Sequence, residues 1–237
     1  MRPCDAPAFP IRCLVATNVP LQNPPRKTFH GDGHRLLMDS VGGFDVEDAL
    51  SLRLQAIVME SPLLSPILRN WQKIALPDCW LVAGAIAQTV WNHSFGFPAT
   101  HGINDVDIVY FDAGDLSETA EAAHALRIRN SFSDLPVWID VKNEARVHLW
   151  YEEKFKYPID PYRSAADAIT TFPTTATAVG LQPRADGLEL CAPYGISDLL
   201  GLIVRPVKKQ ITREIYGNKV NRWVASWPEL KIVGWDE

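Results

Sequence analysis

The stretch Asn104-Asp105-Val106-Asp107-Ile108-Val109 places two carboxylates one residue apart in an otherwise apolar run that is typical of a β-strand. Because side chains alternate along a strand, we expect Asp105 and Asp107 to share one face and their apolar neighbours to enter the core. Aspartate is disfavoured in strands, and adjacent carboxylates repel each other. A bound cation offsets that cost, and Mg²⁺, which prefers oxygen ligands, is the natural candidate. The alternative is a pair of strand-end aspartates that cap loops.

A third carboxylate and a glycine extend this pattern. Asp140 lies in a second strand-like run, Val137-Trp138-Ile139-Asp140-Val141. Upstream, the run Trp80-Leu81-Val82-Ala83 reaches Gly84 and then a helical pattern, and the amides at a helix N-terminus favour a phosphate. The order of these elements indicates nucleotidyl transfer: a strand, a glycine and a helix come first, a strand with Asp-x-Asp follows, and a strand with a single Asp comes last. The alternative for Gly84 is a tight turn that needs glycine for its backbone alone.

The composition is that of an ordinary globular protein. The chain has 237 residues, of which 47% are hydrophobic and 22% charged, so one domain with at most a small appendage is expected. The formal net charge of -5 argues against non-specific coating of nucleic acid, which needs a broad basic surface. A local basic patch is still compatible with this balance.

The four cysteines are scattered without a C-x-x-C pair, which favours neither a zinc cluster nor a disulfide framework and predicts a reducing compartment. No apolar run approaches the roughly 18 residues that a membrane helix needs. The first residues lack the basic and then apolar build of a secretion signal. We therefore expect a cytoplasmic protein without membrane contact.

The chain divides into two parts. Six of the eighteen prolines fall in the first 25 residues and several glycines follow, so residues 1–44 are predicted to form a flexible arm. Within it, His30-Gly-Asp-Gly-His34 offers metal ligands, although a linker is the favoured interpretation. Residues 45–237 are predicted to form the folded domain, with a core at about 72–157 and a C-terminal helical and strand extension at 158–237.

Hydrophobic periodicity and capping residues predict the elements of this domain. The expected helices span residues 46–60, 61–76, 84–93, 115–130, 164–172, 197–204 and 209–226. The expected strands span residues 79–83, 105–112, 137–141 and 188–192. Alternation of strands and helices places the core in the α+β or α/β class.

Four segments carry a resemblance to a known family: residues 81–92, 104–112, 140–148 and 192–198. Their order resembles the nucleotidyltransferase superfamily typified by DNA polymerase beta. They are more closely similar to a largely uncharacterised nucleotidyltransferase-like family found in bacteria and fungi, over about residues 46–235. The resemblance implies a polymerase-beta-type fold, a small mixed sheet flanked by helices, with the carboxylates on adjacent strands.

The resemblance and the chemistry imply the same roles for the three carboxylates. Two cations about 3.5–4 Å apart can clamp the attacking and leaving oxygens of an in-line displacement. By this hypothesis Asp105 and Asp107 bind both Mg²⁺ (or Mn²⁺) ions, and Asp140 holds the catalytic ion and helps to deprotonate the acceptor. All three are therefore candidate catalytic and metal-binding residues.

The candidate nucleotide-binding residues surround these acids: Gly84, Ala85, Asn104, Lys142 and Arg146. Gly84 lets the backbone approach the phosphates, and the positively charged side chains of Lys142 and Arg146 suit phosphate oxygens. Side chains in the extended run after Asp140 point alternately to opposite sides, so they cannot all line one site. We interpret His148 in that run as structural.

The leading hypothesis is a metal-dependent nucleotidyltransferase that transfers a nucleoside monophosphate from a nucleoside triphosphate to a hydroxyl or amine acceptor and releases pyrophosphate. The acceptor is unidentified, with RNA and a small molecule as alternatives. The superfamily usually has Ser or Gly where this chain has Ala85, and the gap from Gly84 to Asp105 is longer than in its minimal members. These departures leave a rival, a non-catalytic nucleotide- or RNA-binding module, and a toxin-like or regulatory enzyme that modifies RNA or protein is a third possibility.

Two other features have competing explanations. Residues 205–222 contain six Lys or Arg and one acid, which we interpret as a solvated helix face, with a docking patch for RNA as the alternative. Most of the eight tryptophans are expected to pack in the core, and one that stacks on a nucleobase is the alternative. Motifs for P-loop, α/β-hydrolase and zincin chemistry are absent from the sequence.

Overall fold

The computed structural model describes Leu14–Val15 and residues 46–237. Within this part, six strands form one sheet in the order β1-β6-β5-β2-β3-β4, and β7 and β8 form a separate parallel pair. In the larger sheet β3 and β4 are parallel, whereas the other neighbours are antiparallel. The predicted α+β fold with a small mixed sheet is confirmed. The strands are β1 (Leu14–Val15), β2 (Trp80–Val82), β3 (Asp105–Tyr110), β4 (Trp138–Asn143), β5 (Gly180–Arg184), β6 (Gly187–Cys191), β7 (Ile203–Val204) and β8 (Lys231–Ile232).

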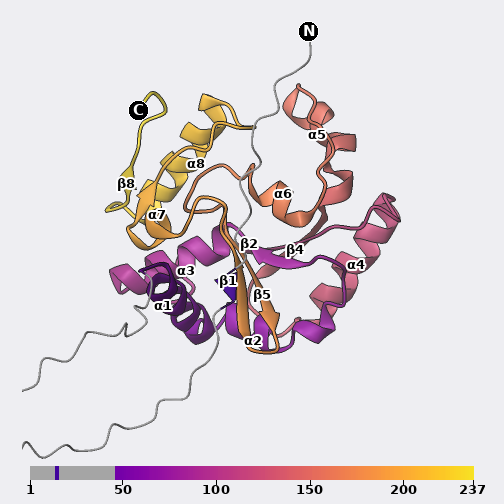
Figure 1. Ribbon diagram of the computed structural model, residues 1–237, viewed down its shortest axis with the longest axis horizontal. Coiled ribbons are helices and arrows are strands. Elements are labelled where there is room, and N and C mark those ends of the chain that lie inside the picture. The colour runs from indigo at the N-terminus through magenta and orange to yellow at the C-terminus, as the bar shows by residue number, and fades with distance from the viewer. Residues whose placement is uncertain (1–13, 16–45) are drawn as a thin grey trace, which may run out of the picture.

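Helices flank this sheet. In Figure 1, α5 and α6 (salmon) lie on one side of the strands, and α1 and α3 (indigo to magenta) lie on the other. The α8 helix packs against α3, where Trp223 meets Trp91 edge-on. Two short 3-10 turns, η1 (Trp71–Lys73) and η2 (Glu144–Arg146), connect elements. The helices are α1 (Val46–Glu60), α2 (Leu64–Arg69), α3 (Gly84–Phe95), α4 (Glu118–Ser131), α5 (Val147–Phe155), α6 (Ala165–Ile169), α7 (Ser197–Leu200) and α8 (Arg213–Ser226).

The two faces of the sheet have different roles. Val106 and Ile108 of β3 are fully buried in the main core, together with side chains of α1, α3 and α4. Val109 points the other way and joins a smaller core that includes Ile169 of α6. Alternation along β3 therefore places Asp105 and Asp107 on the face away from the main core, as the sequence predicts.

Several predicted boundaries move because a different residue caps the helix. The α4 helix begins after Ser117, whose hydroxyl accepts a hydrogen bond from the Ala120 amide, whereas the predicted helix starts at residue 115. Asp115 instead accepts from the amide of Ser117. In the same way α8 begins after Thr212 rather than near residue 209. Asp, Ser and Thr are all good caps, so local sequence alone did not select among them.

The predicted helix at 61–76 is shorter in the structure, as is the one at 197–204, which ends at Leu200 before β7, and β5, α5 and β8 were not predicted. The first of these helices is divided into α2 and η1 at Asn70, whose φ of -115° is not helical. Residues 180–184 form β5, although they contain a glycine and Pro183, which are disfavoured in strands. Non-local pairing with β2 and β6 imposes this strand. The stretch 147–155, which had no assigned structure, forms α5.

The predicted flexible arm, residues 1–44, lies outside the described residues except for Leu14–Val15, which pairs with β6 as β1. The motif His30-Gly-Asp-Gly-His34 also lies outside them. Across residues 46–237, none of the helices is both long and apolar enough to span a membrane.

Candidate active site

Parallel pairing of β3 and β4 brings the predicted carboxylates together. Asp107 lies directly opposite Asp140, and Asp105 lies opposite Trp138. Residues in register on neighbouring strands point to the same face of a sheet. The three carboxylates therefore gather on the face that the main core leaves open, at the β4 edge of the sheet.

Asp107 carries the strongest electrostatic signal of the three. Its burial, followed by the nearby carboxylates of Asp105 and Asp140, raises its pKa to about 7. Lys219 and Lys142 act in the opposite direction without cancelling this effect. Burial and the neighbouring carboxylates thus both disfavour the charged form of Asp107, and a bound cation would favour it.

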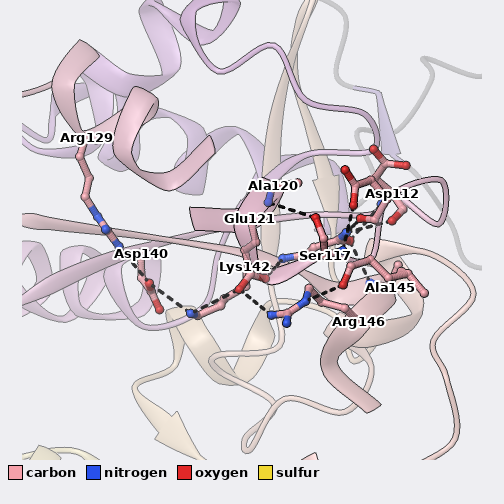
Figure 2. Close-up of polar contacts among 12 residues, drawn as sticks. Asp112, Ser117, Ala120, Glu121, Arg129, Asp140, Lys142, Ala145 and Arg146 are labelled. Carbon is pink, nitrogen blue, oxygen red and sulfur yellow. Dashed lines mark hydrogen bonds and ion pairs between the residues drawn. The ribbon is translucent and has the colours of Figure 1, made fainter. Parts of the chain in front are cut away.

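Asp140 has two cationic partners, as Figure 2 shows. Its Oδ1 lies 3.4 Å from Nη2 of Arg129, which reaches across from α4, and 3.8 Å from Nζ of Lys142. Lys142 Nζ in turn lies 3.9 Å from Oε1 of Glu121. These contacts draw Asp140 into a chain of alternating charges along the sheet edge.

Metal ligands are therefore only partly assembled. No group of three or more His, Cys, Asp and Glu side chains in the described part of the chain is arranged to hold a metal ion. The donors that are present are carboxylate oxygens, which suit Mg²⁺ or Mn²⁺, and a cation bound to them would stabilise the ionised form of Asp107. Asp105 and Asp107 fit a metal-binding role directly, whereas Asp140 has Arg129 and Lys142 against its Oδ1 and would bind the ion in their presence.

The N-terminus of α3 lies beside these acids. Val82 of β2 is opposite Asp107, so the chain passes from β2 into α3 at the Asp105 end of β3. Ala83 at this junction has φ of 62° and ψ of -127°, a conformation that L-residues rarely adopt. Such strain is concentrated at functional sites, where the surrounding fold maintains it.

Gly84 needs no special conformation of its own. Its φ is not in the left-handed region, and a Cβ added there would contact only Nε2 of Gln88, at an ordinary 3.6 Å. Neither the turn nor the packing therefore requires glycine, which favours the ligand-binding interpretation of Gly84 over the tight-turn alternative. Ala85 is buried in the main core, so only its backbone can face a ligand.

The two predicted phosphate-binding cations have different surroundings. Lys142 is 45% exposed and stands between Asp140 and Glu121. Arg146 is 11% exposed, and its guanidinium donates to Glu121 at 2.9 Å and to the carbonyl of Leu116 at 3.1 Å. Lys142 is thus available to a ligand, whereas Arg146 first has to release Glu121.

The structure adds residues that the sequence analysis missed. Lys219 of α8 lies close enough to Asp107 and Asp105 to interact electrostatically, and its burial lowers its pKa. The other five basic residues of the segment 205–222 are exposed, so the favoured solvated-face interpretation fails for Lys219 alone. Glu144 is a fourth carboxyl group near Asp107, and its burial raises its pKa to about 8. The excess of basic residues in the segment 205–222 of an acidic chain was the sequence feature that could have pointed to Lys219. No sequence feature pointed to Glu144.

One tryptophan stands apart from the others. Trp138 is 57% exposed, lies opposite Asp105, and has the guanidinium carbon of Arg129 at 3.8 Å from its ring centroid. Trp91 and Trp227, in contrast, are fully buried. Packing is thus the main role of the buried tryptophans, and Trp138 is an aromatic surface next to the acids.

The acid-bearing parallel strands, with a helix N-terminus beside them, are the arrangement expected of a nucleotidyltransferase. A nucleotidyltransferase family model matches residues 69–232, more than half of the chain, and the chain belongs to this family. Among solved structures, the chain is similar to a protein whose NMR structure reveals a CCA-adding enzyme head domain. The identity is 25% and the TM-score 0.64, and the match covers 77% of this chain and 95% of that one. No curated protein matches the chain.

Proposed function

We propose that this nucleotidyltransferase transfers a nucleoside monophosphate from a nucleoside triphosphate to a hydroxyl or amine acceptor in a reaction that requires Mg²⁺ or Mn²⁺. The observation that carries the proposal is the gathering of Asp105, Asp107 and Asp140 on one face of the sheet, next to the N-terminus of α3. The acceptor atom attacks the α-phosphorus, the bond from that phosphorus to the bridging oxygen breaks, and pyrophosphate leaves. The acceptor loses one proton.

Each residue has a role in this scheme. Asp105 and Asp107 hold the divalent ions, which, when bound, stabilise the charge that develops on the phosphate oxygens. Asp140 orients the acceptor and helps to receive its proton. The backbone amides of Gly84 and Ala85 face the phosphates, where the helix dipole favours negative charge. Asn104, Lys142 and Arg146 are proposed to contact the nucleotide.

We propose an RNA end as the acceptor. The similar structure is described as a CCA-adding enzyme head domain, which favours RNA over a small molecule. The exposed ring of Trp138, with Arg129 beside it, offers the aromatic and guanidinium surfaces on which unpaired bases stack. Its position opposite Asp105 would place a stacked terminal nucleotide next to the acids.

A transfer assay tests the proposal. Purified protein is incubated with each α-phosphate-labelled nucleoside triphosphate, Mg²⁺ or Mn²⁺, and fractionated cellular RNA. We expect label to enter RNA with wild type, and an Asp107→Asn variant to lose at least about 100-fold of the rate. The matched control is Asp186→Asn, which changes an exposed carboxylate in the β5–β6 turn and should leave transfer unchanged. Equal transfer by Asp107→Asn and wild type would refute the assignment.

A second variant tests the phosphate contact. Gly84→Ala should fold normally because the added Cβ has room within the protein, yet it should raise the KM for the triphosphate because the methyl group meets the phosphates. An unchanged KM would remove Gly84 from the site. Metal-dependent triphosphate binding by wild type without transfer to any acceptor would instead favour the rival, a non-catalytic binding module that the buried Ala85 allows.

A further inference from the structure

A row of aromatic and charged side chains runs along β4 on either side of Asp140. Trp138, Asp140 and Lys142 alternate with buried residues, so they share one face of the strand. The guanidinium of Arg129 lies over the Trp138 ring and also reaches Oδ1 of Asp140. Nζ of Lys142 lies 3.8 Å from the same oxygen, and Figure 2 shows this succession of charges. The row is therefore continuous from Trp138 to Lys142.

Beyond Lys142 the row continues across a cavity of about 250 Å³ to α5. Trp150 and Lys154 of this helix line the cavity together with Lys142. Nζ of Lys154 lies 5.4 Å from the centroid of the Trp150 ring. The pair of Trp150 and Lys154 thus repeats the pair of Trp138 and Arg129, and each consists of a tryptophan with a cation beside its ring.

The charges of this cavity leave one cation without a carboxylate partner. Its lining holds three basic side chains, Lys142, Arg146 and Lys154, and two acidic ones, Glu118 and Glu121. Glu121 is taken by Arg146 at 2.9 Å, in a pair whose side chains are both nearly buried. Lys154 is exposed, and none of the carboxylates in the described part of the chain lies within 4 Å of its Nζ. The cavity therefore offers a free positive charge beside an aromatic ring.

The outer edge of β4 is closed to a further protein strand. β4 is the last strand in the order of the described sheet. Nε of Arg129 donates to the carbonyl of Ile139 at 2.7 Å, and Glu121 accepts from the amide of Asn143 at 2.7 Å. These bonds occupy backbone groups that an added strand would need for pairing. The side chains of the row, rather than the backbone of the edge, are thus what β4 offers to a partner.

We propose that this row binds the single-stranded end of an RNA acceptor, with the terminal base on Trp138, an earlier base on Trp150 and a phosphate between them at Lys154. Unpaired RNA is bound by aromatic rings on which its bases stack and by cations along its backbone. Four residues of strand, or about 13 Å, separate Trp138 from Lys142, so the row is longer than one stacked base. This inference rests on the proposed function, and it specifies an acceptor with at least two unpaired nucleotides.

The test measures RNA binding without any nucleoside triphosphate, so that its result does not depend on transfer. The probe is a fluorescein-labelled, unstructured single-stranded RNA of about 12 nucleotides, followed by fluorescence anisotropy and compared with its blunt duplex. Trp150→Leu should bind the single strand about 10-fold more weakly, because it loses one stacking surface. Trp235→Leu is the matched control, since Trp235 is also half-buried and has Lys208 at 5.6 Å from its ring, yet it does not line the cavity.

A second variant tests the phosphate contact on an exposed side chain, where folding is not at risk. Lys154→Gln should reduce the slope of log affinity against log salt concentration by about 0.7, the contribution of one phosphate contact in a single strand. A change in packing alone would leave this slope as it is. The matched control is Lys156→Gln, which changes an exposed lysine at the end of the same helix, outside the cavity.

Three results would each overturn the proposal. They are equal affinities of Trp150→Leu and Trp235→Leu, an unchanged salt slope for Lys154→Gln, and a blunt duplex that binds as tightly as the single strand. Any of them would leave the transfer reaction standing, because label transfer is measured separately. Conversely, a wild type that binds single-stranded RNA as expected but transfers no label would refute the transfer reaction and leave the RNA-binding row standing.

Discussion

Glu144 gives the most quantitative prediction from this structure. It lies in η2 directly after β4 and is only 7% exposed. Its burial, and then the charges of Glu121 and Asp107, raise its pKa from 4.5 to about 8, although Lys142 acts in the opposite direction. At neutral pH the folded protein therefore keeps this carboxyl group protonated, whereas the unfolded chain has it ionised.

The sign of the resulting pH dependence follows from proton binding. Between pH 4.5 and about 8 the folded state holds one proton more than the unfolded state at this group, so the free energy of unfolding falls as the pH rises. Each pH unit in this interval costs about 1.4 kcal/mol, and the full loss approaches roughly 5 kcal/mol. Glu144→Gln, which cannot ionise, escapes this loss. Its stability relative to wild type should rise by about 4 kcal/mol from pH 5 to pH 9.

Urea unfolding followed by tryptophan fluorescence at pH 5, 7 and 9 measures this difference. Glu121→Gln is a contrasting variant, because Glu121 accepts from the Asn143 amide at 2.7 Å and pairs with the buried Arg146 at 2.9 Å. Removing that charge leaves Arg146 unpaired and should destabilise the protein by about 3 kcal/mol. Unfolding free energies of Glu144→Gln and wild type that run parallel from pH 5 to 9 would show that Glu144 is not held neutral, and the argument would fail.

Three further predictions concern packing and positioning. Gly102→Ala should lower the free energy of unfolding by about 3 kcal/mol, measured with urea, because φ is +68° and the new Cβ would lie 2.5 Å from the Trp227 ring. Gly96→Ala, where φ is +66° but the space around the Cβ is open, should lower it by only about 1 kcal/mol. Equal losses for the two variants would contradict the predicted clash with Trp227. Asn143→Ala should lose about 3 kcal/mol, since this fully buried side chain makes hydrogen bonds to two amides and two carbonyls, and a loss below about 1 would show that these bonds contribute little. Arg129→Met should lower kcat for label transfer about 10-fold while the Kd for the triphosphate stays unchanged, since Arg129 holds Asp140 and not the nucleotide; a changed Kd with an unchanged kcat would reverse that assignment.

The central strands were predictable because the relevant information is local. Alternation in residues 105–110 and 138–143 determines which side chains share a face, and this follows from strand geometry alone. The predicted order of strand, glycine and helix is also confirmed, since α3 begins at Gly84. What alternation cannot give is the register, and the pairing of Asp107 with Asp140 is known only from the structure.

The remainder depends on contacts between distant segments. The strand at residues 180–184 has poor strand propensity and forms because β2 and β6 flank it. Lys219 and Trp223 belong to a helix that begins more than 70 residues after Asp140, the last of the acids, and no local pattern indicates which of its faces meets them. Arg146 illustrates the converse, since its spacing suited a phosphate contact while the fold pairs it with Glu121.

The loop between α3 and β3 explains how α8 comes to cover this site. Asn92 of α3 donates to the carbonyls of Ala99 and His101 and also accepts from Trp227, so one side chain ties the loop to the end of α8. His101 Nε2 lies 3.0 Å from the Ser226 carbonyl oxygen, and Gly102 leaves the space that the Trp227 ring fills. The long gap from Gly84 to Asp105 is therefore the part of the chain on which α8 docks.

This arrangement separates two properties of the enzyme. The carboxylates on β3 and β4 belong to the sheet and carry the proposed chemistry, whereas Gln88, Trp223 and Arg222 are brought together only when α8 docks on the loop. Changes in the loop should then move α8, and Lys219 with it, while the acids on β3 and β4 stay in place. A chain with a shorter loop would keep the carboxylates but lose the surface on which α8 docks.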